Sequence, residues 1–311
     1  MAPSSPARLA PSGRQFVLGH GRDQVVVTEM GATLRTYQRA GRPVVDGFDE
    51  DDLCPSGRGQ ILAPWPNRLA DGRYRFGERR GRAALDEPEH ANAIHGLVRW
   101  LPWEPRSQAQ NVLTMACVLH PQPGYPWRLG LSVEYRLGRD GLSVTTEATN
   151  LDHVPAPFGI GFHPYLTVGT PAIDTTRLRL GSGHVLRSDG RGIPEGRAPV
   201  QGSEFDFRVE RPVGPTRLDT AFTDLERDSD GLAWVEMGHP DEDRSVSLWM
   251  DSTFGYVMAY SADTVVAEER RRRSLAVEPM TCPPDAFRSG ESLVVLEPGA
   301  SWRGAWGIRP S

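Results

Sequence analysis

The sequence has few cysteines, and their number and spacing argue against a disulfide framework. The 311 residues include three, Cys54, Cys117 and Cys282. An odd number of widely separated thiols gives neither the paired pattern of small secreted proteins nor the CxxC spacing of zinc ligands. We therefore expect reduced thiols, a cytoplasmic location and no metal site.

A long apolar run and an excess of positive charge are also missing. No stretch of about 18 apolar residues is present, and residues 1–11 are rich in Pro, Ser and Ala without the apolar core of a signal peptide. The net charge of −5 leaves no surplus of cations for nucleic-acid phosphates or an anionic membrane surface. This balance favours a small neutral partner, and residues 1–13 are expected to form a flexible leader.

Long helices are the third absence, because 33 glycines and 27 prolines interrupt the chain too often. Alternation of apolar and polar residues over 129–137 and again over 142–149, around the turn 138–141, predicts a β-hairpin. Further strands are expected at 24–28, 112–119, 245–250, 255–260, 274–278, 292–296 and 301–308. Residues 49–59 and 188–203 have the composition of loops. We predict an all-β fold with antiparallel sheets, formed by residues 14–311 as one domain.

Polar residues stand beside prolines or glycines in four short clusters. Such rigid or permissive backbone positions can hold a neighbouring side chain in a fixed orientation. His95 and His163 each follow an apolar residue at the end of an expected strand, whereas the other six histidines lie in polar or turn segments. Taken alone, a histidine in such a position is more often structural than catalytic, and Glu278 could be a strand-end carboxylate paired with an arginine. The clusters are residues 64–68 (PWPNR), 92–96 (NAIHG), 161–165 (GFHPY) and 276–280 (AVEPM).

Taken together and in this order, the clusters resemble the aldose 1-epimerase (galactose mutarotase) family. The segments LDTAF at 218–222, GATL at 31–34 and EPG at 297–299 resemble it too, so the likeness spans about residues 20 to 308. The resemblance implies a large antiparallel β-sandwich of the galactose mutarotase-like supersandwich type. It also implies interconversion of the α and β anomers of an aldose, without a cofactor or metal.

The family's functional residues carry over onto this sequence one by one. By this resemblance Glu278 is the base that takes the proton of the C1 hydroxyl, and His163 is the acid that protonates the ring oxygen. His95 would bind near the ring oxygen, while Arg68 and Asp219 would hold other hydroxyls. Asn67 and Tyr165 are further substrate-binding candidates, and Trp65 is either a sugar-stacking or a core residue. Pro279-Met280-Thr281 replaces the surroundings typical of galactose-converting members, which leaves the preferred sugar open.

Four other functions use some of the same residues. A hexose-6-phosphate 1-epimerase would need a basic pocket, for which Arg73, Arg99 and residues 270–273 are candidates. The last group belongs to the charged run 268–273, for which a solvated hairpin tip is the favoured interpretation. The other readings are a sugar-binding protein without turnover, a glycoside hydrolase using Asp219 and Glu278, and a zinc site of two histidines and Glu278. A monomer or a homodimer is expected.

Overall fold

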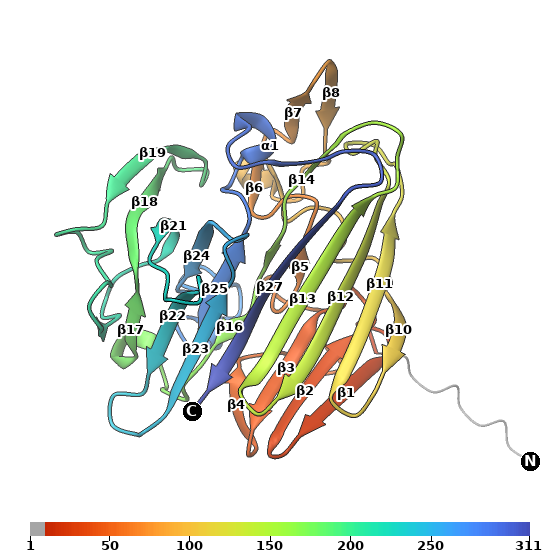
Figure 1. Ribbon diagram of the computed structural model, residues 1–311. Helices are drawn as coiled ribbons and strands as arrows, with labels where there is room; N and C mark the ends of the chain where they lie inside the picture. Colours follow the sequence, from red (N-terminus) through yellow and green to blue (C-terminus); the bar gives the residue numbers. More distant parts are fainter. Residues whose placement is uncertain (1–9) are drawn as a thin grey trace, which may run out of the picture.

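Two large antiparallel sheets form most of the computed structural model, which describes residues 10–311 (Figure 1). The larger sheet has 12 strands, ordered β1-β2-β3-β4-β16-β25-β24-β21-β18-β19, with β15 and β5 attached beside β25. The bounds of its strands are β1 (Gln15–His20), β2 (Asp23–Thr28), β3 (Leu34–Arg39), β4 (Arg42–Val45), β5 (Ile61–Leu62), β15 (Gly161–Phe162), β16 (Tyr165–Leu166), β18 (Ser182–Ser188), β19 (Pro194–Pro199), β21 (Asp219–Leu225), β24 (Tyr256–Tyr260) and β25 (Leu275–Met280).

The second sheet has nine strands, ordered β10-β11-β12-β13-β27-β23-β22-β17-β20. Its strands are β10 (Glu104–Gln108), β11 (Val112–Leu119), β12 (Leu129–Gly138), β13 (Gly141–Asn150), β17 (Arg177–Leu180), β20 (Arg211–Pro212), β22 (Ala233–Gly238), β23 (Ser245–Met250) and β27 (Ser301–Pro310). Three two-stranded sheets complete the β-structure: β6 (Arg68–Ala70) with β9 (Asn92–Ile94), β7 (Arg73–Phe76) with β8 (Arg79–Arg82), and β14 (Ala156–Phe158) with β26 (Val294–Leu296).

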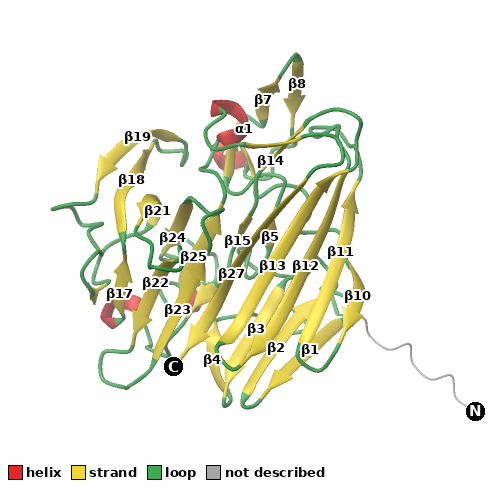
Figure 2. Cartoon of the chain, viewed as in Figure 1, coloured by secondary structure: helices red, strands yellow, loops and turns green. Residues whose placement is uncertain are grey.

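Helical structure is short, as Figure 2 shows in red. It comprises α1 (Ala286–Ser289) and the 3-10 turns η1 (Pro88–His90), η2 (Ile173–Thr175) and η3 (Glu268–Arg270). Within residues 10–311, none of these helices has the length and apolar character needed to cross a membrane.

The predicted all-β, antiparallel fold class is confirmed, and the expected hairpin over 129–149 is β12 and β13. The positive φ that this tight turn requires falls on Gly141, at 107°. The loop expected at 188–203 is partly wrong, because β19 pairs with β18 inside it. Most of the leader expected at 1–13 lies outside the described residues, and its division from a single domain stays a prediction.

The larger sheet packs one face on the core and uses the other face for the site. Along β25, Leu275 and Val277 belong to the main core cluster, which also contains residues of the nine-stranded sheet. Because side chains alternate along a strand, Ala276, Glu278 and Met280 point to the opposite face. All six residues of β25 are nevertheless buried, since loops cover this second face. The polar Glu278 is therefore enclosed and not exposed on a sheet surface.

Candidate active site

Glu278 and His163 meet across neighbouring strands of the larger sheet. β15 pairs with one end of β25 and β16 with the other, and His163 lies between β15 and β16, level with Glu278 in the same register. His163 Nε2 lies 3.3 Å from Glu278 Oε1, and both side chains are almost completely buried. The register of the antiparallel strands thus brings together a carboxyl group and an imidazole that are far apart in the sequence.

Burial shifts the pKa values of Glu278 and His163 in opposite directions. Loss of hydration raises the pKa of Glu278 well above its ordinary value, and nearby Asp219 adds to this effect while Arg68 opposes it. Burial lowers the pKa of His163 to about 3, since the imidazolium also loses hydration there. Burial thus favours the neutral form of both groups, so a proton held by the pair lies on Glu278 and not on His163.

His95 forms the next wall of the site. Its ring meets that of His163 edge to face, with centroids 5.3 Å apart. Its backbone is left-handed, at φ 64°, and its amide donates to the carbonyl of Asn67, which is also left-handed at φ 54°. Asparagine and histidine tolerate this region better than most residues. Burial, followed by His163, lowers the pKa of His95 well below its ordinary value, so its imidazole is neutral.

Arg68 spans two carboxylates at the mouth of the site. Its Nε lies 3.0 and 3.1 Å from the two oxygens of Glu87, and its Nη1 lies 3.2 Å from Asp219 Oδ2. Arg68 and Glu87 are largely buried, whereas 46% of the Asp219 side chain is exposed. Glu87 therefore fixes the guanidinium, and Asp219 keeps oxygen capacity for a ligand.

Tyr165 supports His163 from behind. The two rings stack at 5.0 Å with an interplanar angle of 14°, and the Arg58 guanidinium covers the Tyr165 ring at 3.9 Å from its centroid. The Tyr165 hydroxyl donates to the carbonyl of Ser56. Asn67 contributes mainly through the backbone, since its Oδ1 accepts from the amide of Arg68. We assign to Tyr165 and Asn67 a positioning role in addition to their place on the cavity wall.

These side chains line one cavity of about 370 Å³, called here the central cavity. All seven residues predicted as site residues are on its wall: Asn67, Arg68, His95, His163, Tyr165, Asp219 and Glu278. Glu278 Oε2, His95 Nδ1 and His163 Nδ1 are buried without a hydrogen-bond partner among the described residues. Because unpaired buried polar atoms are costly, this lining suits a ligand with several hydroxyl groups.

Among the further residues on this wall are Glu87, Trp100 and Tyr260, none of which the sequence pointed to. Glu87 lies in the polar segment before η1, where nothing distinguishes it from other surface glutamates. Trp65, left open between stacking and core roles, is a core residue, since it is 3% exposed and packs edge-on against Phe287. Trp100, 43% exposed, is the tryptophan that faces the cavity.

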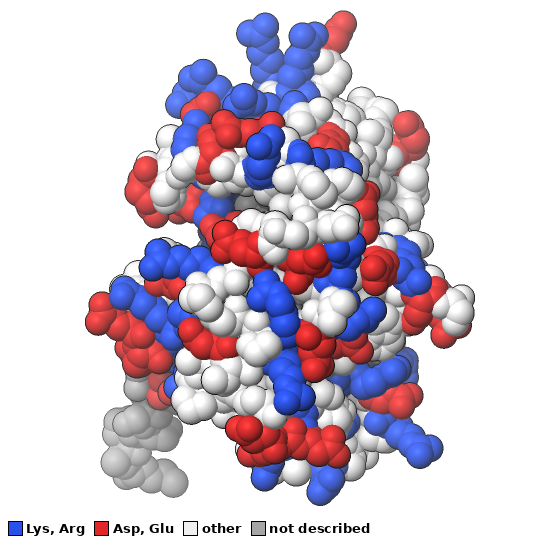
Figure 3. Space-filling model, turned by 90° about the vertical axis from the view of Figure 1, so that its left-hand side faces the viewer, with Lys and Arg blue, Asp and Glu red and all other residues white. Residues whose placement is uncertain are grey.

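The arginines considered for a phosphate pocket lie in three different parts of the structure. Arg99 lines the central cavity and is paired with Asp86. Arg73 lies on the exposed β7–β8 hairpin, where basic side chains project at the upper end of Figure 3. Two arginines of the run 268–273 are partly buried: Arg270 bonds the carbonyl of Gly47, and Arg272 pairs with Asp174 and Asp263. The expected solvated hairpin tip is thus wrong for these two arginines.

No three His, Cys, Asp or Glu side chains within residues 10–311 form a group that could hold a metal ion. The two histidines and Glu278, weighed as zinc ligands from the sequence, are thus not such a group in the described part of the chain.

Known proteins similar to this chain share both its sequence and its fold. The family model described as aldose 1-epimerase matches residues 14–309. The chain is 32% identical over 293 residues to the uncharacterized protein YihR of Escherichia coli, covering 94% of this chain and 92% of YihR. It is 31% identical to the aldose 1-epimerase of the same organism over 229 residues, covering 66% of this chain and 64% of that protein.

Solved structures agree on the fold. The galactose 1-epimerase of Lactobacillus acidophilus superposes with a TM-score of 0.79 at 18% identity, covering 96% of this chain and 94% of that one. The GalM/aldose epimerase homologue of Caenorhabditis elegans superposes with a TM-score of 0.85 at 17% identity, covering 96% and 98%. With the family model matching nearly the whole chain and the sheets arranged as in these structures, this protein belongs to the aldose 1-epimerase family.

Proposed function

We propose that the protein is an isomerase that interconverts the α and β anomers of an aldose, with Glu278 and His163 as its proton-transferring pair. The observation that carries this proposal is the buried contact of 3.3 Å between Glu278 Oε1 and His163 Nε2 on the wall of the central cavity. General acid–base catalysis requires groups within hydrogen-bonding reach of the atoms that exchange protons. One shared proton between two such groups suits a reaction in which one proton is taken and one is given.

The chemistry balances with these two groups. Glu278, as the carboxylate, takes the proton of the C1 hydroxyl, and His163, as the imidazolium, protonates the ring oxygen while the bond between C1 and that oxygen breaks. The open aldehyde rotates about its C1–C2 bond, and the reverse proton transfers close the ring on the other face. No atom is oxidised or reduced, so the proposal includes no cofactor. The chain has no lysine, so no lysine can trap the aldehyde as an imine.

The resting position of the proton is compatible with these roles. In the empty site burial places it on Glu278, whereas the forward reaction needs it on His163. A sugar hydroxyl that donates to Glu278 stabilises the carboxylate, because hydrogen bonds to the charged form lower its pKa. His95, as a neutral imidazole, would donate to the ring oxygen region, and Arg68 with Asp219 would hold hydroxyls remote from C1.

A panel of freshly dissolved aldoses followed by polarimetry tests this function. We expect catalytic amounts of the protein to accelerate mutarotation of at least one common aldose beyond the spontaneous rate. His163→Asn should abolish most of the acceleration while leaving the circular dichroism spectrum unchanged. Calorimetric binding of these sugars without any acceleration would instead identify a sugar-binding protein, and release of a chromogenic aglycone would identify a hydrolase.

We further propose that the substrate is a neutral aldose and not a hexose phosphate. Around the central cavity Arg68 is balanced by Glu87 and Asp219, and Arg99 by Asp86, so the described lining offers no unpaired arginine to a phosphate. Glucose 6-phosphate should therefore be a poorer substrate than glucose or galactose. A preference for the phosphate ester would refute this part of the proposal.

A cytoplasmic location remains our proposal, and the thiols support it. Cys54, Cys117 and Cys282 are free. Burial raises the pKa of all three, to about 12 for Cys54 and Cys282, which keeps them protonated and unreactive. Labelling of the native protein with a thiol reagent should consequently be slow.

A further inference from the structure

Four arginines of the β7–β8 hairpin share one of its faces. The sequence from 73 to 82 is RYRFGERRGR, and the two strands pair with Arg73 opposite Arg82 and Arg75 opposite Arg80. In an antiparallel pair, opposed residues and residues two apart along a strand point to the same side. The register therefore places all four guanidinium groups on the same side of the hairpin, and all four residues are exposed.

The opposite face anchors the hairpin to the rest of the protein. Tyr74 packs edge-on against Phe287 with ring centroids 5.1 Å apart, and Phe76 packs edge-on against Trp127 at 5.6 Å. A Cβ at Gly81 would collide with the Tyr74 ring, so this ring lies directly across the partner strand. The hairpin stands beyond the upper ends of the large sheets in Figure 1. The arginine face is thus held on a rigid support that projects from the protein.

This face lines a hollow of about 680 Å³, called here the arginine pocket. Asp71, Tyr74, Gly81 and Arg288 of α1 complete the lining. The arginine pocket shares no lining residue with the central cavity. It is therefore a separate place on the molecule, to which the proposed isomerase chemistry assigns no role.

Neighbouring carboxylates do not balance the charge of the arginine pocket. Asp71 is paired with Arg191, and Arg288 has Asp285 at 3.7 Å. Within residues 10–311, none of the four hairpin arginines has a carboxylate at ion-pair distance. Like charges directly opposite each other on two strands repel. The hairpin thus carries an unfavourable interaction that a bound anion would relieve.

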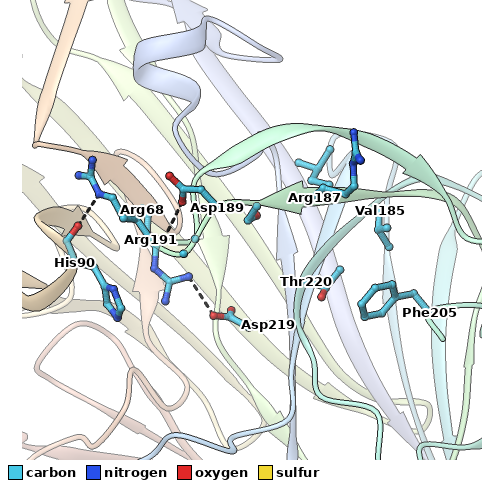
Figure 4. A pocket seen from close by; sticks show the side chains of 13 residues that line it. Arg68, His90, Val185, Arg187, Asp189, Arg191, Phe205, Asp219 and Thr220 are labelled. Atoms are coloured by element: carbon cyan, nitrogen blue, oxygen red, sulfur yellow. Dashed lines mark hydrogen bonds and ion pairs between the residues drawn. The ribbon is translucent and has the colours of Figure 1, made fainter. Parts of the chain in front are cut away.

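Other arginines nearby do have partners. Figure 4 shows Arg68 bonded to Asp219, and Arg191 bonded to the carbonyl of His90. These contacts use up the donors that could otherwise attract an anion. The hairpin face differs from them because its guanidinium groups point away from the protein's own acceptors.

The geometry of the face suits a chain of linked phosphates. A guanidinium can donate two parallel hydrogen bonds to one phosphate. The opposed Cβ atoms lie about 5 Å apart, and the two arginine pairs follow each other at about 7 Å along the strands. One phosphate cannot reach all four groups at this spacing, whereas two or three linked phosphates can. The volume also falls in the range of small-ligand sites, about 300–1,000 Å³.

We propose that the arginine pocket binds a small ligand with linked phosphate groups, of the nucleoside triphosphate or inorganic polyphosphate kind. A longer polyanion fits less well, because the cationic face is only one hairpin long and the net charge of the protein is −5. Figure 3 shows acidic side chains over much of the surface below the basic end. Nucleic acid or an anionic membrane would lie against this acidic surface.

Calorimetric titration of the full chain with inorganic tripolyphosphate, at low salt, tests the proposal. We expect one ligand per chain with a Kd below about 0.1 mM, and weaker binding as the salt concentration rises. Inorganic phosphate should bind at least about tenfold more weakly than tripolyphosphate. The double variant Arg75→Ala/Arg80→Ala removes one opposed pair and should weaken tripolyphosphate binding about tenfold or more.

ATP distinguishes the two sources of linked phosphates. An affinity for ATP equal to that for tripolyphosphate would support recognition of the phosphate chain alone. Clearly tighter binding of ATP would support a nucleotide as the ligand. Tripolyphosphate should also raise the Tm of the wild type, because a ligand that binds only the folded state stabilises it, and should raise the Tm of the hairpin variant much less.

Arg303→Ala/Arg309→Ala is the matched control, because it removes the same charge from exposed positions of β27 in the other large sheet. It should leave tripolyphosphate binding unchanged, and circular dichroism checks that both double variants are folded. The proposal is overturned if neither tripolyphosphate nor ATP binds, or if the control weakens binding as much as the hairpin variant does. Tighter binding of duplex DNA or of phosphatidylserine vesicles than of tripolyphosphate would overturn the assignment to a small ligand.

Discussion

Replacing Glu278 with glutamine should lower turnover and also change how stability depends on pH. A glutamate with a purely structural role would not show both effects. The substitution keeps the size and shape of the side chain but removes its titration. Positioned general bases contribute about 10² to 10⁴ in rate, so Glu278→Gln should lower kcat by at least about a hundredfold. At the same time the variant should gain stability relative to the wild type as the pH rises.

The sign of the stability effect follows from the raised pKa of Glu278. In the unfolded chain the carboxyl releases its proton near its ordinary value of 4.5, whereas the folded protein retains it to higher pH. The folded state therefore binds more protons above pH 4.5, and the wild type loses stability as the pH rises towards the folded pKa. The loss is about 1.4 kcal/mol for each pH unit in that interval. Glutamine does not titrate, so the unfolding free energy of Glu278→Gln should not fall in this way as the pH rises.

Urea denaturation at pH 5 and pH 8 measures this difference, and polarimetry measures turnover. The variant's advantage in unfolding free energy should be larger at pH 8 than at pH 5. Glu147→Gln is the matched control, since Glu147 is an exposed strand glutamate on β13 and should change neither quantity. Near-normal turnover of Glu278→Gln would exclude Glu278 as the base, and an equal stability relative to the wild type at both pH values would contradict the raised pKa of Glu278.

Three further predictions concern the groups around this pair. The acid limb of the kcat/KM profile should lie near pH 3, where His163 becomes protonated and the pair holds two protons. Activity at pH 4.0 should therefore stay close to activity at pH 5.5. A fall of about fourfold between these pH values, as for a glutamate of ordinary pKa 4.5, would contradict a single proton shared by the pair. Gly57→Ala should cost about 1–2 kcal/mol of stability at φ 71° and also reduce kcat, because its Cβ would lie 3.0 Å from His163 Cδ2; Gly77→Ala, with positive φ and open space, should show no loss of kcat. Trp100→Ala should raise KM for sugars several-fold with kcat nearly constant, and an unchanged KM would remove Trp100 from substrate binding.

The sequence predicted the features that depend on neighbouring residues. The hairpin of β12 and β13 follows from alternation and a glycine turn, and both are local. The distance between Glu278 and His163 depends on the pairing of β15, β16 and β25, which no local pattern specifies. These two residues were found through resemblance, not through periodicity.

Residues outside the motifs were missed for the same reason. Glu87 gains its importance because both of its carboxylate oxygens accept from Arg68 Nε, and that contact exists only after β6 and β9 pair. Trp65 and Trp100 look alike in sequence, but packing against Phe287 places the first in the core. Arg272 looked solvated because the run 268–273 is charged, yet Asp174 and Asp263 from other segments enclose it.

We expect the register that sets His163 opposite Glu278 to form late in refolding, and the proposed activity to return with it. The β12–β13 hairpin needs only a two-residue connection, whereas β15 must find β5 on one side and β25 on the other, across long stretches of chain. Pairing of distant segments loses more conformational entropy on loop closure, so these pairings form slowly. Regain of turnover after dilution from denaturant should therefore lag behind the circular dichroism signal of β-structure. The time course of turnover would then report when the larger sheet is completed.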